Sequence, residues 1–283
     1  MIKCSVSIVT YQQADFIRQS VESALDQRTD FPIEVIVGDD ASTDGTREVV
    51  EALAAAHPDR VVPLLADRNY GDYGLSNVMA TLDAARGEYV AFLDGDDYWT
   101  DPKKLARQIA FMDAHPNCAI SAHRVAHVGE GVNSHLSVRP GPGDRTWAYG
   151  RLLNVNFTPK SATVIRRSAL SHLPDWYRTT TVASAAWLFN LLVANGGPVG
   201  FVDRTMAAHR LHGANLTTHY GAERMLTDKL DTFRLLRATV PQATGAIRQA
   251  ETRVRLRLAI MRHAPGAYGM LKRSFNMLLA RRR

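Results

Sequence analysis

The chain has 283 residues, enough for one large or two small domains, and 46% of them are apolar, as in a soluble globular protein with a core. General disorder is therefore excluded. Cys4 and Cys118 lie far apart and each begins an apolar run, which favours buried free thiols over a disulfide framework or a metal site. We expect a reducing, cytoplasmic compartment, no signal peptide and no membrane-spanning helix.

The net charge of +6 is unevenly distributed along the chain. Residues 221–283 contain 14 lysines and arginines against four acidic residues, whereas residues 1–220 contain 20 against 24. This asymmetry indicates an anionic partner, either a membrane surface or a nucleic acid. No nucleic-acid-binding module accompanies the basic charge, so we expect no nucleic acid.

Strands and helices alternate in the first part of the predicted fold. Short β-branched or apolar runs predict strands, and apolar residues at helical spacing predict helices. The predicted strands are 5–10, 34–38, 61–66 and 89–93, and the predicted helices are 14–27, 42–57 and 76–85. This order predicts an α/β fold with a mostly parallel sheet and helices on both faces.

In such sheets, ligands bind beyond the carboxyl ends of the strands. Three predicted strands end there in polar residues, namely Thr10 with Tyr11, Asp39 with Asp40, and the acidic run 94–97. Each alone is explained by a helix cap, a turn residue or a half-buried aromatic ring. Together they predict a nucleotide pocket, with a ring for stacking, a carboxylate for a base N–H, and further carboxylates for metal and diphosphate.

The acidic run follows the predicted strand in YVAFLDGDDYWTDP, residues 89–102. Three carboxylates this close repel one another, so a cation is expected with them. Mg²⁺ or Mn²⁺ is favoured, because these ions take one or two carboxylates plus water and phosphate oxygens, and no Cys/His cluster favours zinc. The alternative is a solvated acidic turn.

Three motifs resemble a known family. VSIVTYQQADFIRQSVESAL, IVGDDASTDGT and GEYVAFLDGDDYWTDPKKLARQI are similar, in this order, to bacterial family 2 glycosyltransferases of the GT-A fold. The resemblance is strong over about residues 5–115 and weaker to about residue 218. It implies transfer of a sugar from a nucleotide-diphosphate donor, with UDP favoured, to an acceptor hydroxyl with inversion.

The resemblance also implies roles for single residues. Tyr11 and Asp40 would contact the nucleobase, and residues 94–97 would form the D-x-D-type element at ribose and metal, with Asp96 and Asp97 as preferred metal contacts. The predicted donor site consists of Thr10, Tyr11, Asp39, Asp40, Asp94, Asp96 and Arg210. The expected domains are a GT-A domain over 1–219, with a nucleotide-sugar half (1–115) and an acceptor half (116–219), and a basic helical extension over 220–283.

In the acceptor half, we expect a helix over 102–115, strands over 118–128 and 158–165, and a Gly/Pro-rich loop over 129–143 between these strands. A short strand over 199–202 precedes TMAAHRLH, residues 205–212, which resembles the family's Y-R-x-H ending. His212 is therefore expected to complete the metal shell or contact the diphosphate, and Arg210 to supply positive charge. For His209, an ordinary surface position is favoured.

A helix predicted from Ser184 to about Asn195 contains one departure from the family. Displacement at an anomeric carbon needs a base for the acceptor proton, and family members commonly have an acidic residue before an aromatic one here. This chain has Ala186 before Trp187. The substitution is engineered, or natural in an inactive relative, or else another residue such as Asp175 or Asp203 is the base. We favour an engineered substitution, because the donor motifs are intact.

Residues 222–238, 244–262 and 266–283 have helical apolar spacing with arginines between. Basic amphipathic helices suit the inner face of an anionic membrane, which would favour a lipid-linked saccharide or cell-envelope glycan as acceptor; solvated helices are the alternative. Three functions are thus considered: a metal-dependent glycosyltransferase, a catalytically inactive nucleotide-sugar-binding scaffold, and a nucleotidyltransferase. The last is disfavoured, because SIVTYQQAD has no glycine for a phosphate loop.

Overall fold

The computed structural model describes residues 1–129, 141–182, 184–211 and 222–264. Contacts divide the chain into two compact units, Met1–Thr181 with Ala185–Asn215, and Val182–Ser184 with Leu216–Arg283. The expected domain boundary after residue 219 and the division of the first domain into two halves remain predictions. Of the sequence-based expectations, most of the loop 129–143, His212 and the helix 266–283 lie outside the described residues.

The first unit begins with the predicted alternation of strands and helices. Its first seven elements are β1 (Cys4–Thr10), α1 (Ala14–Leu25), β2 (Ile33–Asp39), α2 (Thr46–Ala56), β3 (Val61–Leu65), α3 (Leu75–Ala84) and β4 (Tyr89–Asp94). The elements that follow are β5 (Tyr98–Trp99), α4 (Lys104–Ala114), β6 (Ile120–Val128), β7 (Arg145–Trp147), α5 (Tyr149–Asn154), the 3₁₀ helix η1 (Lys160–Ala162), β8 (Val164–Arg166), the 3₁₀ helices η2 (Arg167–His172) and η3 (Asp175–Thr179), α6 (Ala185–Ala194) and β9 (Val199–Arg210).

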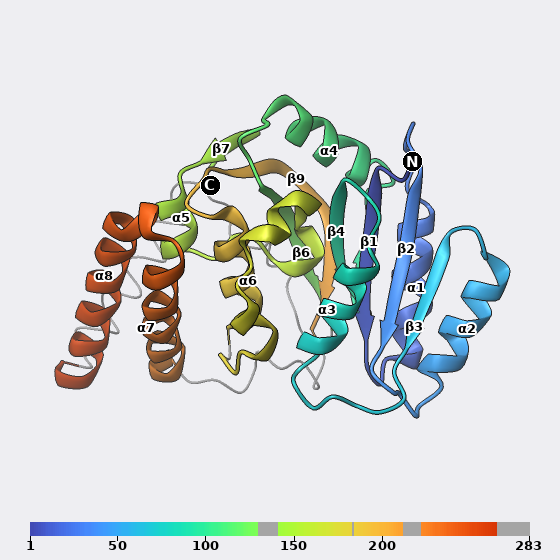
Figure 1. The fold of residues 1–283 in the computed structure, drawn as a ribbon, viewed down its shortest axis with the longest axis horizontal. Coiled ribbons are helices and arrows are strands. Elements are labelled where there is room, and N and C mark those ends of the chain that lie inside the picture. The colour runs from blue at the N-terminus through green and yellow to red at the C-terminus, as the bar shows by residue number, and fades with distance from the viewer. Residues whose placement is uncertain (130–140, 183, 212–221, 265–283) are drawn as a thin grey trace. The chain divides into compact units, whose positions relative to one another are not determined.

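Among the described residues, the strands form one nine-stranded sheet in the order β3-β2-β1-β4-β8-β6-β9-β5, with β7 also paired to β9. The first four strands are parallel, whereas β8 pairs antiparallel to both β4 and β6. Helices α1 and α2 lie on one face of the sheet and α3 lies on the other (Figure 1). This confirms the predicted α/β fold, in which helices on both faces explain why all seven residues of β2 are buried.

Two predicted strands in the acceptor half differ from the structure. Residues 158–165 form η1 and only then the short β8, because Pro159 starts a tight turn in which its carbonyl accepts the Ala162 N–H at 3.0 Å. Residues 199–202 and 205–212 were expected as separate segments, but β9 runs without interruption to Arg210. A bulge at Asp203 and Arg204, where the β6 register shifts, accommodates the polar residues between them.

The second unit contains α7 (Ala222–Thr239), the 3₁₀ helix η5 (Pro241–Ala243) and α8 (Thr244–His263). The two long helices pack through buried apolar residues such as Phe233 and Ile247. Several arginines of α8 are exposed, and Arg262 is ion-paired with Glu223 at 2.7 Å. No helix in the described part of the chain combines the length and apolar character needed to span a bilayer.

Candidate active site

The register of the parallel strands brings the predicted donor residues to one edge of the sheet. Thr10 at the end of β1 is paired with Asp39 at the end of β2, and Val9 is paired with Asp94 at the end of β4. The backbone N–H of Asp40 donates to the Thr10 carbonyl at 3.1 Å, which extends the ladder into the loops. The predicted convergence of these three segments is therefore present in the structure.

Side chains that follow β2 accept hydrogen bonds from backbone N–H groups between β1 and the start of α1. Ser42 Oγ accepts the Gln12 N–H at 2.9 Å, Thr46 Oγ1 accepts the Gln13 N–H at 2.8 Å, and Asp44 Oδ2 accepts the Ala14 N–H at 3.1 Å. These bonds satisfy N–H groups that the helix itself leaves unpaired. As the sequence predicted, residues 42–46 open a helix: α2 begins at Thr46, whose N–H donates to Asp44 Oδ1 at 3.0 Å. The side chains of the same residues also cap α1, which the sequence did not predict.

Close packing at the edge explains the glycine of the D-G-D-D run. A Cβ on Gly95 would lie 2.4 Å from Gln13 Oε1 and 2.8 Å from Thr10 Cβ. The Thr10 hydroxyl donates to the same Gln13 oxygen at 2.9 Å, so Thr10 is buried and already hydrogen-bonded. Thr10 therefore shapes the edge between β1 and the acidic run.

Asp39 and Asp40 have different surroundings. Asp40 Oδ2 accepts from Asn69 Nδ2 at 2.9 Å and Oδ1 accepts the Tyr70 N–H at 3.0 Å, and burial raises the pKa of this carboxyl. Asp39 Oδ2 accepts the Ser42 N–H at 3.1 Å, while its buried Oδ1 has no hydrogen-bond partner in the described residues. Asp40 thus holds the 69–70 loop, whereas the Asp39 carboxylate is buried at the end of β2.

Two tyrosine rings at this edge are open to solvent. Tyr11, directly after β1, is 46% exposed, and Tyr70, whose N–H is held by Asp40, is 47% exposed. Sequence reasoning identified Tyr11 but missed Tyr70 and Asn69, because only the hydrogen bonds to Asp40 connect that loop to the edge. Both rings are flat apolar surfaces of the kind on which a nucleobase can stack.

Two of the three carboxylates of the acidic run, those of Asp94 and Asp97, are held by residues from other segments. Asp94 Oδ1 lies 2.6 Å from Lys160 Nζ. Asp97 is buried and accepts hydrogen bonds from the Ser161 hydroxyl and, at 3.1 Å, from the Arg210 N–H, and its Oδ1 lies 3.0 Å from His209 Nδ1. The hydrogen bond with Asp97 raises the pKa of His209, and Asp97 joins the acidic run to the end of β9.

Arg210 is occupied by the protein itself. Its guanidinium donates to the Asp96 carbonyl and to Gln19 Oε1 and lies over the rings of Tyr98 and Phe16, with centroid distances of 4.5 and 5.1 Å. These contacts hold the backbone of the acidic run in place. Arg210 was predicted as a donor contact, and in this geometry its clearest effect is to position Asp96.

The residues present fit a hard divalent ion in one arrangement. No group of three or more His, Cys, Asp or Glu side chains suited to a metal occurs among the described residues, and His212 lies outside them. Mg²⁺ and Mn²⁺, however, bind through one or two carboxylates plus substrate phosphates. Both oxygens of Asp97, an expected metal contact, already accept hydrogen bonds, and Asp94 Oδ1 is ion-paired with Lys160. Asp96 together with the second carboxylate oxygen of Asp94 therefore fits this mode better than Asp96 with Asp97.

Ala186 is an exposed residue in the first turn of α6. One turn later, the Phe189 ring meets Phe92, two residues before Asp94, at a centroid distance of 5.5 Å. Asn190 donates to the Thr158 carbonyl at 3.0 Å, which ties the helix to the segment that contains Lys160. Position 186, where the resemblance implies an acidic residue, therefore lies on a helix that packs against β4. It is near the edge formed by the ends of β1, β2 and β4, which we call the donor edge.

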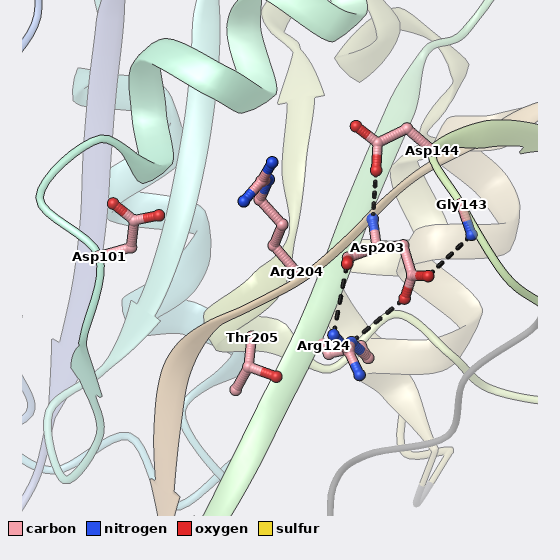
Figure 2. Close-up of a pocket in the computed structure, with 7 residues that line it drawn as sticks. All are labelled: Asp101, Arg124, Gly143, Asp144, Asp203, Arg204 and Thr205. Carbon is pink, nitrogen blue, oxygen red and sulfur yellow. Dashed lines mark hydrogen bonds and ion pairs between the residues drawn. The ribbon is translucent and has the colours of Figure 1, made fainter. Parts of the chain in front are cut away.

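Of the alternative bases, Asp203 is held in a separate pocket. Its Oδ1 lies 3.2 Å from Arg124 Nε and its Oδ2 accepts the Gly143 N–H at 2.7 Å, in a pocket of about 500 Å³ (Figure 2). Asp203 lies six positions before His209 in β9, so the two residues are about 20 Å apart along the strand. Asp175 is exposed in η3. Asp203 is therefore poorly placed for the acceptor.

Comparison with known proteins identifies relatives. The Glycosyl transferase family 2 model matches residues 5–173. An uncharacterized protein of Mycobacterium tuberculosis is 35% identical over 209 residues, which are 74% of this chain and 58% of that protein. The Escherichia coli UDP-Glc:alpha-D-GlcNAc-diphosphoundecaprenol beta-1,3-glucosyltransferase WfaP is 38% identical over 109 residues, 38% of this chain and 41% of that protein. The chain thus spans less than two thirds of the length of these relatives.

Solved structures share the fold. Staphylococcus aureus TarS in complex with UDP has a TM-score of 0.68 at 20% identity, over 93% of this chain and 73% of that chain. The mannosyltransferase PcManGT of Pyrobaculum calidifontis in complex with GDP-Man and Mn²⁺ has a TM-score of 0.62 at 18% identity, over 98% and 80%. The fold is GT-A, and because the family model matches more than half of the sequence, the chain belongs to glycosyl transferase family 2.

Proposed function

We propose that the protein is a metal-dependent, inverting glycosyltransferase that uses a nucleotide-diphosphate sugar, with UDP as the favoured nucleotide. The observation that best supports this is the meeting of three strand ends, those of Thr10, Asp39 and Asp94, beside the exposed ring of Tyr11. That arrangement offers a stacking surface and several carboxylates within one edge of the sheet.

Each group has a role in holding the donor. Tyr11 stacks on the base, and Asp40, whose carboxylate also holds the neighbouring 69–70 loop, accepts a base N–H. Asp94 and Asp96 hold Mg²⁺ or Mn²⁺, completed by His212, and Asp97 fixes the run to β9. The bound ion supplies positive charge for the departing diphosphate. A mannosyltransferase of the same fold, PcManGT, was solved with Mn²⁺, which supports this assignment.

The acceptor hydroxyl would attack from the side of α6. Inversion in a single step needs one base, and position 186 at the start of this helix is the proposed place for it. In this chain the residue is alanine, which accepts no proton, so the sequence as it stands lacks this base. A catalytically inactive nucleotide-sugar-binding scaffold is therefore the second candidate, and Ala186 is the observation that favours it.

The acceptor is proposed to be a cell-envelope glycan or a lipid-linked saccharide. WfaP is a glucosyltransferase named for its action on a diphosphoundecaprenol-linked sugar, which supports this class. Exposed arginines of α8, among them Arg253 and Arg257, would place a cytoplasmic protein peripherally on the anionic inner face of the membrane.

Calorimetric titration of UDP with and without Mn²⁺ tests the donor site without an acceptor or a base. We expect UDP to bind more tightly with Mn²⁺, and Asp96→Ala to remove the gain from Mn²⁺. Asp59→Ala, a matched change at an exposed aspartate after α2, should leave both affinities unchanged. Failure to bind UDP, GDP and TDP under either condition would reject the proposed function.

A further inference from the structure

Lys160 places a positive charge beside Asp94 of the acidic run. Its Nζ lies 2.6 Å from Asp94 Oδ1, and the two side chains are 24% and 29% exposed, so the pair is accessible to a ligand. The pairing is not evident from the sequence, because 66 residues separate the two positions.

The backbone under Lys160 is held on several sides. The Thr163 hydroxyl donates to the Pro159 carbonyl at 2.9 Å, and the Phe92 N–H of β4 donates to the Thr163 carbonyl at 3.0 Å. The neighbouring residue Ser161 accepts the Trp99 indole N–H at 2.9 Å on its carbonyl. Lys160 therefore extends from a turn whose position relative to β4 is fixed.

The other cationic side chains of this edge are already engaged. Arg210 donates to Asp96 and Gln19, and His209 lies against Asp97. The Lys160 ammonium has three N–H donors, and in the described part of the chain one hydrogen bond, to Asp94, is made. Its remaining donors can meet phosphate oxygens on a ligand that lies across Asp94.

We propose that Lys160 binds the diphosphate of the nucleotide donor as a second, permanent cation beside the divalent ion. This rests on the proposed function and adds to it that nucleotide binding has a component independent of metal. With Lys160 present, the charge of Asp94 is compensated before any metal binds, so a diphosphate approaches Asp96 with less repulsion.

The test is calorimetric titration of UDP in EDTA and in Mn²⁺ with four proteins: the wild type, Lys160→Met, Lys160→Arg and Lys103→Met. Lys103, exposed before α4, serves as the matched control. In EDTA, Lys160→Met should weaken UDP binding about tenfold, as expected for loss of one partly exposed charge contact. Lys160→Arg keeps the charge and should retain most of the affinity, and Lys103→Met should match the wild type.

Two results would overturn the inference while leaving the proposed function intact. One is a wild type that binds UDP in Mn²⁺ but not in EDTA, and the other is Lys160→Met with wild-type affinity in EDTA. A wild type that binds no nucleotide in either condition rejects the proposed function together with the inference. Thermal unfolding of each variant checks that a loss of binding is not a loss of fold, and wild-type affinity in Lys160→Arg excludes a purely steric effect.

Discussion

The donor edge and the acceptor side of the first unit are built in different ways. At the donor edge, loops after three strands are joined by hydrogen bonds from Ser42, Asp44 and Thr46, and the acidic run is anchored through Asp97. The acceptor side includes three short 3₁₀ helices and the apolar helix α6, with an exposed alanine at its start. The donor edge is thus cross-linked by hydrogen bonds, whereas the acceptor side has at position 186 an alanine, which accepts no proton.

Restoring a carboxylate at position 186 should have the largest effect. Ala186→Asp is expected to raise the rate of sugar transfer by about 10²- to 10⁴-fold, the usual contribution of a positioned base. UDP release from UDP-sugars, measured with a panel of saccharide and lipid-linked saccharide acceptors, would report it. Ala186→Asn is the matched control, because it has the same size but accepts no proton. Equal rates in all three proteins would move the base elsewhere and favour the scaffold function.

Within the acidic run, Asp97 is expected to contribute to the stability of the fold. Asp97→Ala leaves Ser161, His209 and the Arg210 N–H without their buried acceptor, and should lower the free energy of unfolding by about 3 kcal/mol. Asp59→Ala, the same change at an exposed aspartate, should cost less than about 1 kcal/mol. Urea denaturation measures both, and equal losses would show that Asp97 has no special structural role.

Lys104, the first residue of α4, is fully buried without a hydrogen-bond partner in the described residues. Its Nζ lies 3.9 Å from the Trp99 ring centroid. Burial lowers its pKa from 10.5 to about 7. Below pH 7 the lysine is charged in both states, and the folded protein bears the full cost of the buried charge. Between pH 7 and 10.5 only the unfolded state holds the proton, so stability rises with pH and the cost disappears.

Lys104→Met should therefore raise the free energy of unfolding by about 2 kcal/mol at pH 6. The gain over the wild type should shrink as the pH rises from about 7 towards 10.5. Denaturant unfolding across this range measures it, with the exposed neighbour Lys103→Met as control. A gain that stays constant with pH would contradict the assignment of a buried, titrating ammonium.

The sequence predicted the parallel half of the fold well, because strands buried on both faces are short apolar runs and the helices between them have clear spacing. It also placed Thr10, Asp39 and Asp94 at one edge, since parallel strands share their carboxyl ends. Two of the acceptor-side segments were misjudged. Residues 158–165 have β-branched residues, but Pro159 redirects the chain into a turn.

The sequence did not predict which residues far apart along the chain are hydrogen-bond partners at this site. Asp97 is 112 residues from His209, and no periodicity reports which strand end will lie beside which loop. Asn69 and Tyr70 stand in a loop without a motif, and only the finished fold brings them to Asp40. Long-range pairing of polar groups therefore decides which carboxylates stay available to a ligand, and the sequence alone does not show it.

The hydrogen bonds between the first two loops have a consequence for protein engineering. A chimera that exchanged only residues 40–46 with a relative of different sequence would leave the N–H groups of Gln12, Gln13 and Ala14 without their acceptors at the start of α1. The two loops are thus structurally coupled, and an exchange of either loop between relatives should move both together.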